Sequence, residues 1–318
     1  MEGERVSKYV VTGGGGFIGS HLVRALLAQG RHVTVLDNFS TGKRDNLREV
    51  AADCEIIEGD ITDYKTVEAA LQGARAVLHQ AALPSVPRSL RDPLRSNEVN
   101  ITGTLHVLHA AAAAGVERFV FAGSSSVYGN QPGLPRVETM RTAPASPYAL
   151  NKLAGETYTR LYSELFGLES VTLRYFNVFG PRQNPDSEYA AVIPRFIRAM
   201  LAGEAPHIHG DGQQSRDFTY VQNVVDANLR ALSAPKLHGE AVNIGGGGTV
   251  TLEQVVDRIN DRLGTRIKPQ HGPNRPGDVK HSRADIQLAE RLLGYRPSIG
   301  FEEGLTRSIC WYQDGKGV

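Results

Sequence analysis

Short apolar runs alternate along the first half of the chain with longer segments whose apolar residues recur at helical spacing. The short runs predict strands at Tyr9–Val11, His32–Leu36, Glu55–Ile57, Ala76–Leu78 and Arg118–Ala122. The longer segments predict helices at Phe17–Leu27, Val67–Leu71 and Pro93–Ala114. This alternation predicts a doubly wound parallel α/β sheet of the Rossmann type, with a ligand crevice beyond the carboxyl ends of its strands.

The second half of the chain is less regular. Ser146 and Pro147 suit the N-cap and first position of a helix that runs to about Phe166, and a strand is predicted at Val171–Leu173. Beyond residue 180 the segments become shorter and richer in glycine and proline. We therefore expect a main domain over residues 1–180, rejoined by about 216–240, and a smaller C-terminal α/β lobe over residues 181–318.

Three glycines separate the first predicted strand from the first predicted helix. Gly13, Gly16 and Gly19 let the backbone approach a pyrophosphate, whose charge is stabilised by the positive end of the helix dipole. Asp37 ends the second predicted strand, where a carboxylate accepts hydrogen bonds from a ribose 2′-hydroxyl and repels a 2′-phosphate. The pattern predicts NAD rather than NADP, and its alternative is a tight turn that holds no ligand.

The ends of the other predicted strands belong to the same crevice, because parallel strands end at one edge of the sheet. This argument places the following residues around one cofactor: Asp37, Asp60, Ile61, Gln80, Ala81, Ala82 and Ser124. The Asp60-Ile61 pair has an equally good alternative as a helix-capping loop.

Composition narrows the class of protein. The 318-residue chain has a net charge of +1 and no apolar run of membrane-spanning length, so we expect neither a nucleic-acid partner nor a membrane protein. Its N-terminus lacks a signal-peptide pattern, and we expect a cytoplasmic location. Cys54 and Cys310 have no CxxC partner, and His207 and His209 share a strand face without a third ligand. We therefore expect no disulfide framework and no bound metal.

Tyr148 and Lys152 are four residues apart on a predicted helix, so their side chains share one face. An ammonium beside a phenol lowers the phenol's pKa and makes it a general base for a hydroxyl whose carbon loses hydride. Ser124, at the end of a predicted strand, is placed to hydrogen-bond the same hydroxyl. The alternative is an ordinary surface pair of tyrosine and lysine.

A series of motifs then makes the chain recognisable. In order, they are TGGGGFIGSHL, LDNFSTG, GDI, HQAALPSVPRS, GSSSVYG, SPYALNK, LRYFNVFGPRQ, GDGQQSRDFTYV and RPGDVKHSRADI. Together they resemble the extended short-chain dehydrogenase/reductase superfamily, and within it the nucleotide-sugar 4-epimerases. The similarity is greatest to bacterial UDP-N-acetylglucosamine 4-epimerases, in which SVPRS, YFNVFG and SRDF recur.

The resemblance implies catalytic roles for Ser124, Tyr148 and Lys152. With the strand ends, it predicts NAD contacts from Gly13, Gly16, Phe17, Ile18, Gly19, Asp37, Asn38, Ser40, Asp60, Ile61, Gln80, Ala81, Ala82, Asn100, Tyr148, Lys152, Tyr175 and Val178. It predicts UDP-sugar contacts from Ser85, Ser124, Tyr148, Asn177, Val192, His207, His209, Arg216, Arg275, Asp278 and Ser282. In the implied reaction, hydride passes from sugar C4 to NAD and returns to the opposite face of a 4-keto sugar.

Ser282 bears on the choice of sugar. In 4-epimerases restricted to non-acetylated sugars, a tyrosine stands at the matching place, whereas this chain has a small residue. We therefore favour UDP-GlcNAc and UDP-GalNAc, with UDP-Glc and UDP-Gal as slower substrates. Its alternative role is to cap a following helix. The Arg216-Asp217 pair has the alternative of an ordinary surface loop, and Ser85 and Arg88 that of a loop capping the helix at Pro93.

Three further expectations follow from the resemblance. The family dimerises through a four-helix bundle, which here would be formed by the helices predicted at Pro93–Ala114 and Pro147–Phe166. UDP-glucuronate 4-epimerases and decarboxylases share the early motifs but need a cationic or hydroxyl clamp for the sugar carboxylate. No clear clamp is evident in the sequence, and Arg88 keeps this alternative open. A 4,6-dehydratase is disfavoured because Ser125 and Ser126 stand where its acid pair belongs.

Outside enzymes, the alternative is an NAD-binding regulatory or interaction protein.

Overall fold

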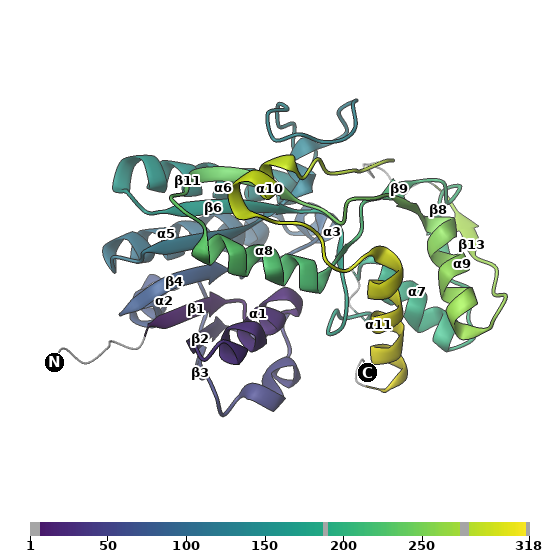
Figure 1. Cartoon of the computed structure of the whole chain (residues 1–318), viewed down its shortest axis with the longest axis horizontal. Coiled ribbons are helices and arrows are strands. Elements are labelled where there is room, and N and C mark those ends of the chain that lie inside the picture. The colour runs from purple at the N-terminus through teal and green to yellow at the C-terminus, as the bar shows by residue number, and fades with distance from the viewer. Residues whose placement is uncertain (1–6, 187–189, 274–279, 316–318) are drawn as a thin grey trace.

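A seven-stranded parallel sheet forms the centre of the molecule, in the order β11-β6-β5-β4-β1-β2-β3 (Figure 1). The structure is a computed structural model and describes residues 7–186, 190–273 and 280–315. The strands of the sheet are β1 (Lys8–Thr12), β2 (His32–Asp37), β3 (Glu55–Glu58), β4 (Ala74–His79), β5 (Arg118–Ser124), β6 (Ser170–Tyr175) and β11 (His238–Ile244). This order confirms the doubly wound parallel α/β fold predicted from the sequence.

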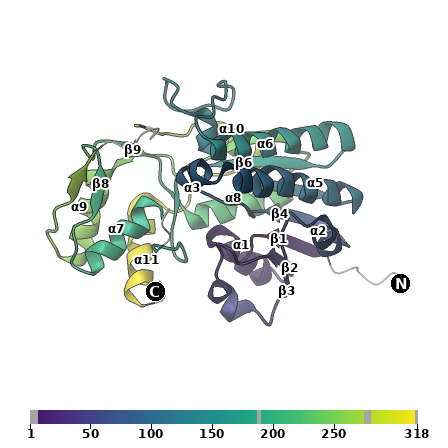
Figure 2. The ribbon, with the colours of Figure 1, turned by 180° about the vertical axis from the view of Figure 1, so that it is seen from behind.

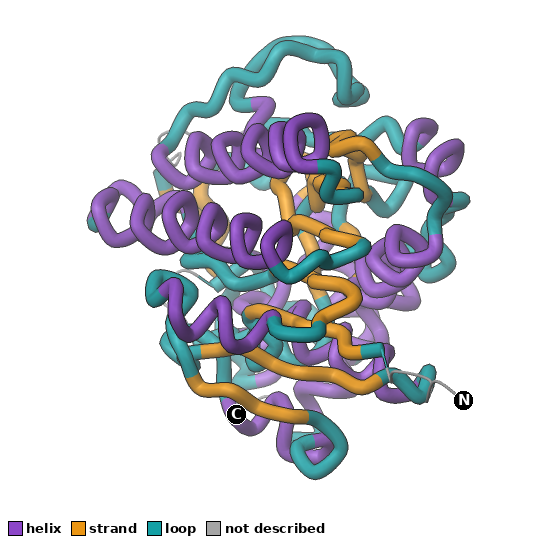
Figure 3. Tube along the Cα trace, turned by 90° about the vertical axis from the view of Figure 1, so that its left-hand side faces the viewer, coloured by secondary structure: helices purple, strands orange, loops and turns teal. Residues whose placement is uncertain are grey.

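Helices cover both faces of the sheet, because successive residues of a strand point to opposite sides. Val10 and Val11 of β1 accordingly belong to two different hydrophobic cores. The helices that pack on the Val11 side are α1 (Phe17–Ala28), α8 (Val221–Ser233) and α10 (Gln287–Leu293). Those on the Val10 side are α2 (Tyr64–Leu71), α5 (Thr104–Ala113) and α6 (Pro147–Phe166). Figures 1 and 2 show the two helical layers from opposite sides, and Figure 3 shows the strands between them.

The C-terminal lobe lies beside the sheet and has a core of its own (Figure 1). Its helices are α7 (Val192–Leu201), α9 (Leu252–Leu263) and α11 (Phe301–Gln313). Three short strand pairs complete this region: β8 (His207–His209) with β13 (Gln270–Gly272), β9 (Ser215–Arg216) with β12 (Val250–Thr251), and β7 (Val178–Phe179) with β10 (Thr219–Tyr220). Between these segments, the chain returns to the large sheet to contribute α8 and β11.

The long helix predicted at Pro93–Ala114 is interrupted, so this prediction is wrong in detail. A short α4 (Pro93–Asn97) is followed by six π-helical residues, Glu98–Gly103, before α5 begins. A further helix, α3 (Val86–Arg91), precedes α4. A π-helical turn is wider than an α-turn and changes where side chains point. Asn100 lies in this segment and turns its side chain to the loop that follows β4.

The turn between β1 and α1 packs directly against the loop after β4. Gly13 has a φ of +70°, and a Cβ placed there would lie 2.6 Å from the backbone nitrogen of Ala81. A Cβ on Gly19 would lie 2.1 Å from the carbonyl oxygen of Gly13. A left-handed φ and two backbone contacts thus require glycine at these positions. The turn exposes backbone at the start of α1, as the predicted pyrophosphate site needs.

Replacing Gly13 with alanine should abolish NAD binding, because the new Cβ displaces the Ala81 backbone. Gly30→Ala is the matched control, since Gly30 has the same φ of +70° but nothing within 4 Å of its added Cβ. Both variants should lose about 1–2 kcal/mol of unfolding free energy to the left-handed backbone, and Gly13→Ala should lose more because its Cβ also displaces Ala81. Calorimetric titration with NAD should then separate them. Equal NAD affinity in the two variants would show that the turn does not hold the cofactor.

Candidate active site

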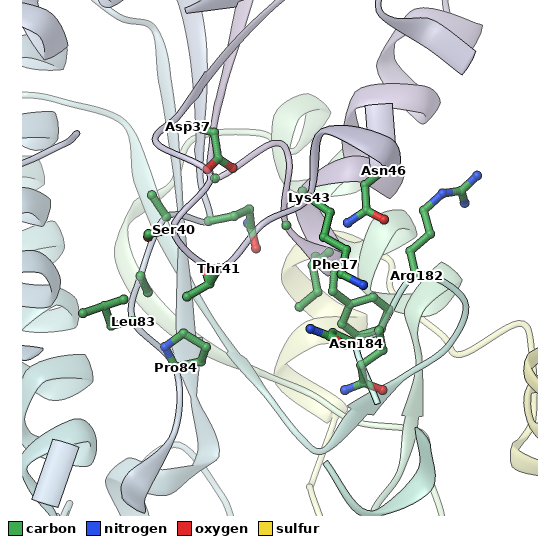
Figure 4. Close-up of a pocket in the computed structure, with 18 of the residues that line it drawn as sticks. Phe17, Asp37, Ser40, Thr41, Lys43, Asn46, Leu83, Pro84, Arg182 and Asn184 are labelled. Carbon is green, nitrogen blue, oxygen red and sulfur yellow. The ribbon is translucent and has the colours of Figure 1, made fainter. Parts of the chain in front are cut away.

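A cavity of about 1100 Å³ opens at the carboxyl ends of β1, β2 and β4 and reaches the C-terminal lobe. Figure 4 shows Asp37 on one side of it and Arg182, from the loop after β7, on the other. Every residue predicted to contact NAD lines this cavity except Asn100 and Val178. Segments that are far apart in the sequence thus meet in one cavity.

Asp37 holds the glycine turn against the end of β2. Its Oδ2 accepts a hydrogen bond from the Gly15 amide at 2.8 Å, and its Oδ1 accepts one from the Phe39 amide at 2.7 Å. Burial raises the pKa of this carboxyl, while the two amides favour its charged form. The carboxylate also lines the cavity, where it can accept from a ribose hydroxyl and would repel a 2′-phosphate.

Asp60 forms another part of the wall. Its Oδ2 accepts hydrogen bonds from Asn38 at 2.9 Å and Arg95 at 2.7 Å, and its Oδ1 accepts two from Thr62. The residue that caps α2 is Asp63. The alternative that Asp60 caps this helix is therefore wrong, and its carboxylate instead braces the cavity wall.

Asn100 lies behind the cavity and supports its loop. The Asn100 side chain accepts from the Leu83 amide at 2.7 Å and donates to the Leu83 carbonyl at 3.0 Å. The side chain is almost fully buried, and both of its polar groups are used by this backbone. Leu83 lines the cavity, so Asn100 acts on it through the loop.

The lining fits a dinucleotide. Gly13 and Gly19 leave backbone at the start of α1 where a side chain would clash. A diphosphate can take hydrogen bonds from such a helix N-terminus, and Asp37 stands at the end of β2 where a ribose is expected. The structure thus supports both halves of the predicted NAD site.

Tyr148 and Lys152 reach the cavity from the first turns of α6. Ser146 caps the helix by accepting from the Ala149 amide, and Pro147 occupies the first helical position, as predicted from the sequence. The Tyr148 amide donates to the Ser89 hydroxyl at 3.0 Å, which ties the helix start to α3. Both Tyr148 and Lys152 line the cavity.

Ser124, at the end of β5, hydrogen-bonds the Tyr148 hydroxyl. Its own oxygen accepts from the Ser126 amide at 3.2 Å and from the Ser126 hydroxyl at 2.9 Å. Because these two donors come from Ser126, the Ser124 proton remains available for Tyr148. Of the three consecutive serines, Ser124 is thus the one in contact with the tyrosine.

The protonation of Tyr148 and Lys152 is governed by burial. Desolvation raises the pKa of Tyr148, and the hydrogen bond from Ser124 lowers it in part. Desolvation also lowers the pKa of Lys152 to about 8. The Lys152 ammonium donates to the Ala122 carbonyl at 2.9 Å and lies 5.0 Å from the ring centre of Phe121. The predicted lowering of the Tyr148 pKa is therefore wrong for the protein's own groups, because desolvation raises this pKa and the group that opposes desolvation is Ser124, not Lys152.

Two of the predicted UDP-sugar contacts, Ser85 and Tyr148, line the cavity. Ser85 also caps α3, since its hydroxyl accepts from the Arg88 amide at 3.3 Å; the helix at Pro93 is capped by Asp92. Arg275 and Asp278 lie outside the described residues. The remaining predicted residues are absent from the described lining of the cavity: Ser124, Asn177, Val192, His207, His209, Arg216 and Ser282.

Asn177, which follows the end of β6, contacts Ser282. The Asn177 amide donates to the Ser282 hydroxyl at 3.1 Å and to the Asp217 carbonyl at 3.0 Å. Helix α10 begins at Gln287, so the alternative that Ser282 caps it is wrong. These bonds bring YFNVFG, SRDF and HSRAD together, although the three motifs are far apart in the chain.

Arg216 and the two histidines lie in short strands of the lobe. Arg216 donates to the carbonyls of Ser215 and Lys280 at 3.1 and 3.0 Å. The rings of His207 and His209 lie 4.7 Å apart on one face of β8. Residues 7–186, 190–273 and 280–315 contain no group of three or more His, Cys, Asp or Glu side chains suited to a metal ion. Nor does this part of the chain contain a helix that could cross a membrane.

Several residues of the cavity wall were not predicted from the sequence. Lys43 lies in the polar loop that follows β2, and no function was predicted for it from the sequence. Its amine points into the cavity beside Phe17 (Figure 4). Arg182 and Asn184 come from the loop after β7, and Trp311 comes from α11. Lys43 stands directly after the motif LDNFSTG, so its place near the cofactor site could have been predicted from the sequence. Trp311 reaches the wall only through the packing of the lobe.

Comparisons with known proteins agree with this site. A sequence model described as the NAD dependent epimerase/dehydratase family matches residues 9–245. UDP-glucose 4-epimerase of Mycolicibacterium smegmatis is 38% identical over 314 residues, which cover 96% of this chain and 98% of the relative.

Solved structures are similar over nearly the whole chain. UDP-N-acetylglucosamine 4-epimerase from Methanobrevibacter ruminantium, in complex with UDP-N-acetylmuramic acid, has a TM-score of 0.93 at 41% identity, covering 97% of this chain and 99% of that one. UDP-glucuronic acid 4-epimerase from Bacillus cereus, in complex with UDP-glucuronic acid and NAD, has a TM-score of 0.90 at 33% identity, covering 96% and 99%. With its glycine turn, Asp37 and the paired Ser124 and Tyr148, this chain belongs to the NAD dependent epimerase/dehydratase family, and its cofactor is NAD.

Proposed function

We propose that this protein interconverts UDP-GlcNAc and UDP-GalNAc by inverting sugar C4, with UDP-Glc and UDP-Gal as slower substrates. The observation that carries the proposal is the Ser124–Tyr148 hydrogen bond, with the tyrosine on the wall of the NAD cavity. Residues 1–180 and the segment 216–240 hold NAD, and the lobe of residues 181–318 holds most of the UDP-sugar. The cytoplasmic location remains a prediction.

Tyr148 handles the proton of the sugar 4-hydroxyl. Ser124 donates a hydrogen bond to Tyr148, which favours the phenolate that takes this proton. Lys152, with its pKa of about 8, keeps a positive charge near Tyr148 until the pH rises through that value. The residues that line the cavity would hold NAD, which would supply the hydride acceptor for oxidation of sugar C4 and the donor for its reduction from the opposite face. Tyr148 then gives its proton back to the sugar 4-oxygen, which becomes the hydroxyl of the epimer.

The choice of an N-acetylated sugar is supported by Ser282. Its small side chain contacts Asn177, a predicted UDP-sugar residue, and leaves more room than a tyrosine would. The Methanobrevibacter ruminantium relative is described as a UDP-N-acetylglucosamine 4-epimerase, which supports the same class. Arg216, Arg275 and Asp278 are proposed to bind the diphosphate and uridine.

UDP-glucuronate is the second candidate substrate. Arg88 lines the cavity that contains Tyr148, so a cationic residue belongs to the wall of the proposed sugar site. The Bacillus cereus relative, crystallised with UDP-glucuronic acid, supports this alternative. Either a 4-epimerase or a decarboxylase would use such a cation, and the two differ in their products.

The first experiment incubates the purified protein with UDP-GlcNAc, without added NAD, and follows the anomeric protons by NMR. We expect UDP-GalNAc to appear, and Tyr148→Phe to lower kcat by about 100-fold or more because the general base is lost. Tyr158→Phe on the same helix is the control and should retain activity. If UDP-glucuronate alone is converted after NAD is supplied, the second candidate is correct. Binding of NAD without turnover of any UDP-sugar would favour a regulatory or interaction protein.

Ser282→Tyr should narrow the substrate range. The larger side chain is expected to reduce kcat/KM for UDP-GlcNAc by about 10-fold or more through steric exclusion of the N-acetyl group. Activity on UDP-Glc should change much less, and Ser282→Ala serves as the control for loss of the hydroxyl. The measurement is the ratio of kcat/KM for UDP-GlcNAc to kcat/KM for UDP-Glc in each variant. An unchanged ratio in Ser282→Tyr would remove Ser282 from the specificity argument.

We also propose a homodimer formed by a four-helix bundle that includes α5 and α6. Leu150, Leu165 and Phe166 of α6 are 54%, 70% and 62% exposed in the single chain, which leaves an apolar surface for a second copy. Light scattering at micromolar concentration should give the mass of a dimer. Leu165→Glu should shift the mass to that of a monomer, whereas Leu201→Glu on α7 should not. A monomeric wild-type protein would contradict the proposal.

A further inference from the structure

A buried ion pair joins the helix that carries Tyr148 and Lys152 to the central sheet. Glu156 lies four residues after Lys152 and eight after Tyr148, so all three share one face of α6. Its carboxylate accepts from Arg174 of β6 twice, from Nε at 2.8 Å and from Nη2 at 2.5 Å. The Arg174 side chain is 5% exposed and the Glu156 side chain 11% exposed. The pair therefore fixes both the distance and the orientation between α6 and β6.

The same arginine also contacts the turn that begins at Ser124. Arg174 Nη1 donates to the Tyr128 hydroxyl at 2.7 Å, and this hydroxyl donates to Asn243 of β11 at 2.7 Å. Tyr128 ends the 3₁₀ turn Ser125–Tyr128, and Ser124 is the N-cap of that turn. A continuous set of polar contacts thus runs from α6 through Glu156, Arg174 and Tyr128 to the segment that begins at Ser124.

Stability alone is a poor explanation for this network. Burying two charges costs several kcal/mol, and apolar residues of similar volume often stabilise a fold as well or better. What an apolar pair cannot supply is the directional geometry of a two-bond contact between guanidinium and carboxylate. That geometry is needed where two reacting side chains come from different elements, because a displacement of about 1 Å can cost 100-fold in rate.

We propose that Glu156, Arg174 and Tyr128 are positioning residues that hold the Ser124 hydroxyl against the Tyr148 hydroxyl. The proposal rests on the function proposed above, in which these two hydroxyls handle the proton of the sugar. Glu156 sets the helix that carries Tyr148, and Tyr128 sets the turn that carries Ser124. Arg174 contacts both, so the relative position of the two hydroxyls depends on it.

The principal test is Glu156→Gln, which keeps the size of the side chain and removes its charge. We expect kcat to fall by about 10-fold or more while KM for the UDP-sugar stays near the wild-type value. Loss of the Ser124 contact should also raise the pKa of Tyr148, so the rising limb of kcat against pH moves to higher pH. Glu164→Gln is the matched control: it breaks the exposed pair of Glu164 with Arg160 on the same helix and should change neither readout.

Two further variants separate positioning from folding. Tyr128→Phe cuts the link to the Ser124 turn and leaves the ion pair intact, so it should reproduce the loss of kcat and add little to Glu156→Gln. The double variant Glu156→Leu with Arg174→Met replaces both charged groups by apolar side chains. It should be more thermally stable than Glu156→Gln, while its kcat should stay below that of the wild type. Recovery of kcat with stability would overturn the proposal and leave the network a structural role.

A titration that needs no turnover keeps this proposal apart from the proposed function. The phenolate absorbance of NAD-loaded protein, minus that of the corresponding Tyr148→Phe protein, reports the pKa of Tyr148. We expect a higher value in Glu156→Gln than in the wild type. An unchanged value contradicts the positioning role whatever the substrate is. A wild-type protein that turns over no UDP-sugar contradicts the proposed function, while this titration still decides the network.

Discussion

The close approach of two backbones, at Gly13 and Ala81, is the constraint on which the rest of the site depends. It brings the turn after β1 against the loop after β4, and no side chain fits between them. Asp37 then fixes the same turn from β2, and Asn100 fixes the loop from behind. This part of the cavity wall is therefore backbone held at several points, which suits the firm binding of a dinucleotide.

Burial shifts the pKa values of two cavity-lining groups, Tyr148 and Lys152, in opposite directions. It raises the pKa of Tyr148 and lowers that of Lys152, so each group is pushed toward its neutral form. A neutral tyrosine cannot take a proton. Among the protein's own groups, the hydrogen bond from Ser124 lowers the pKa of Tyr148 and so opposes the effect of burial. The additional charge of the oxidised nicotinamide favours the phenolate in the same direction. In the proposed reaction, proton transfer would thereby depend on the presence of bound NAD.

The sequence predicted those parts of the site that depend on local pattern. The strands, the glycine turn, Asp37 and the start of α6 follow from periodicity, spacing and capping, and each lies where it was expected. The π-helical break was not predictable in this way, because the spacing of apolar residues along a helical segment does not distinguish a π-turn from an α-turn. The contact between Asn177 and Ser282 was also invisible, since it joins residues more than a hundred positions apart. Tertiary packing, not local preference, decides both.

The same distinction explains why Glu156 could not be interpreted from the sequence. A glutamate four residues after a lysine on a helix looks like an ordinary surface pair with that lysine. In the structure, Lys152 turns to the Ala122 carbonyl, and Glu156 turns to Arg174. Only the folded sheet reveals that this arginine also reaches the turn of Ser124. The side chains proposed to carry the chemistry therefore follow from motifs, whereas the side chains proposed to align them follow from the way the elements are packed.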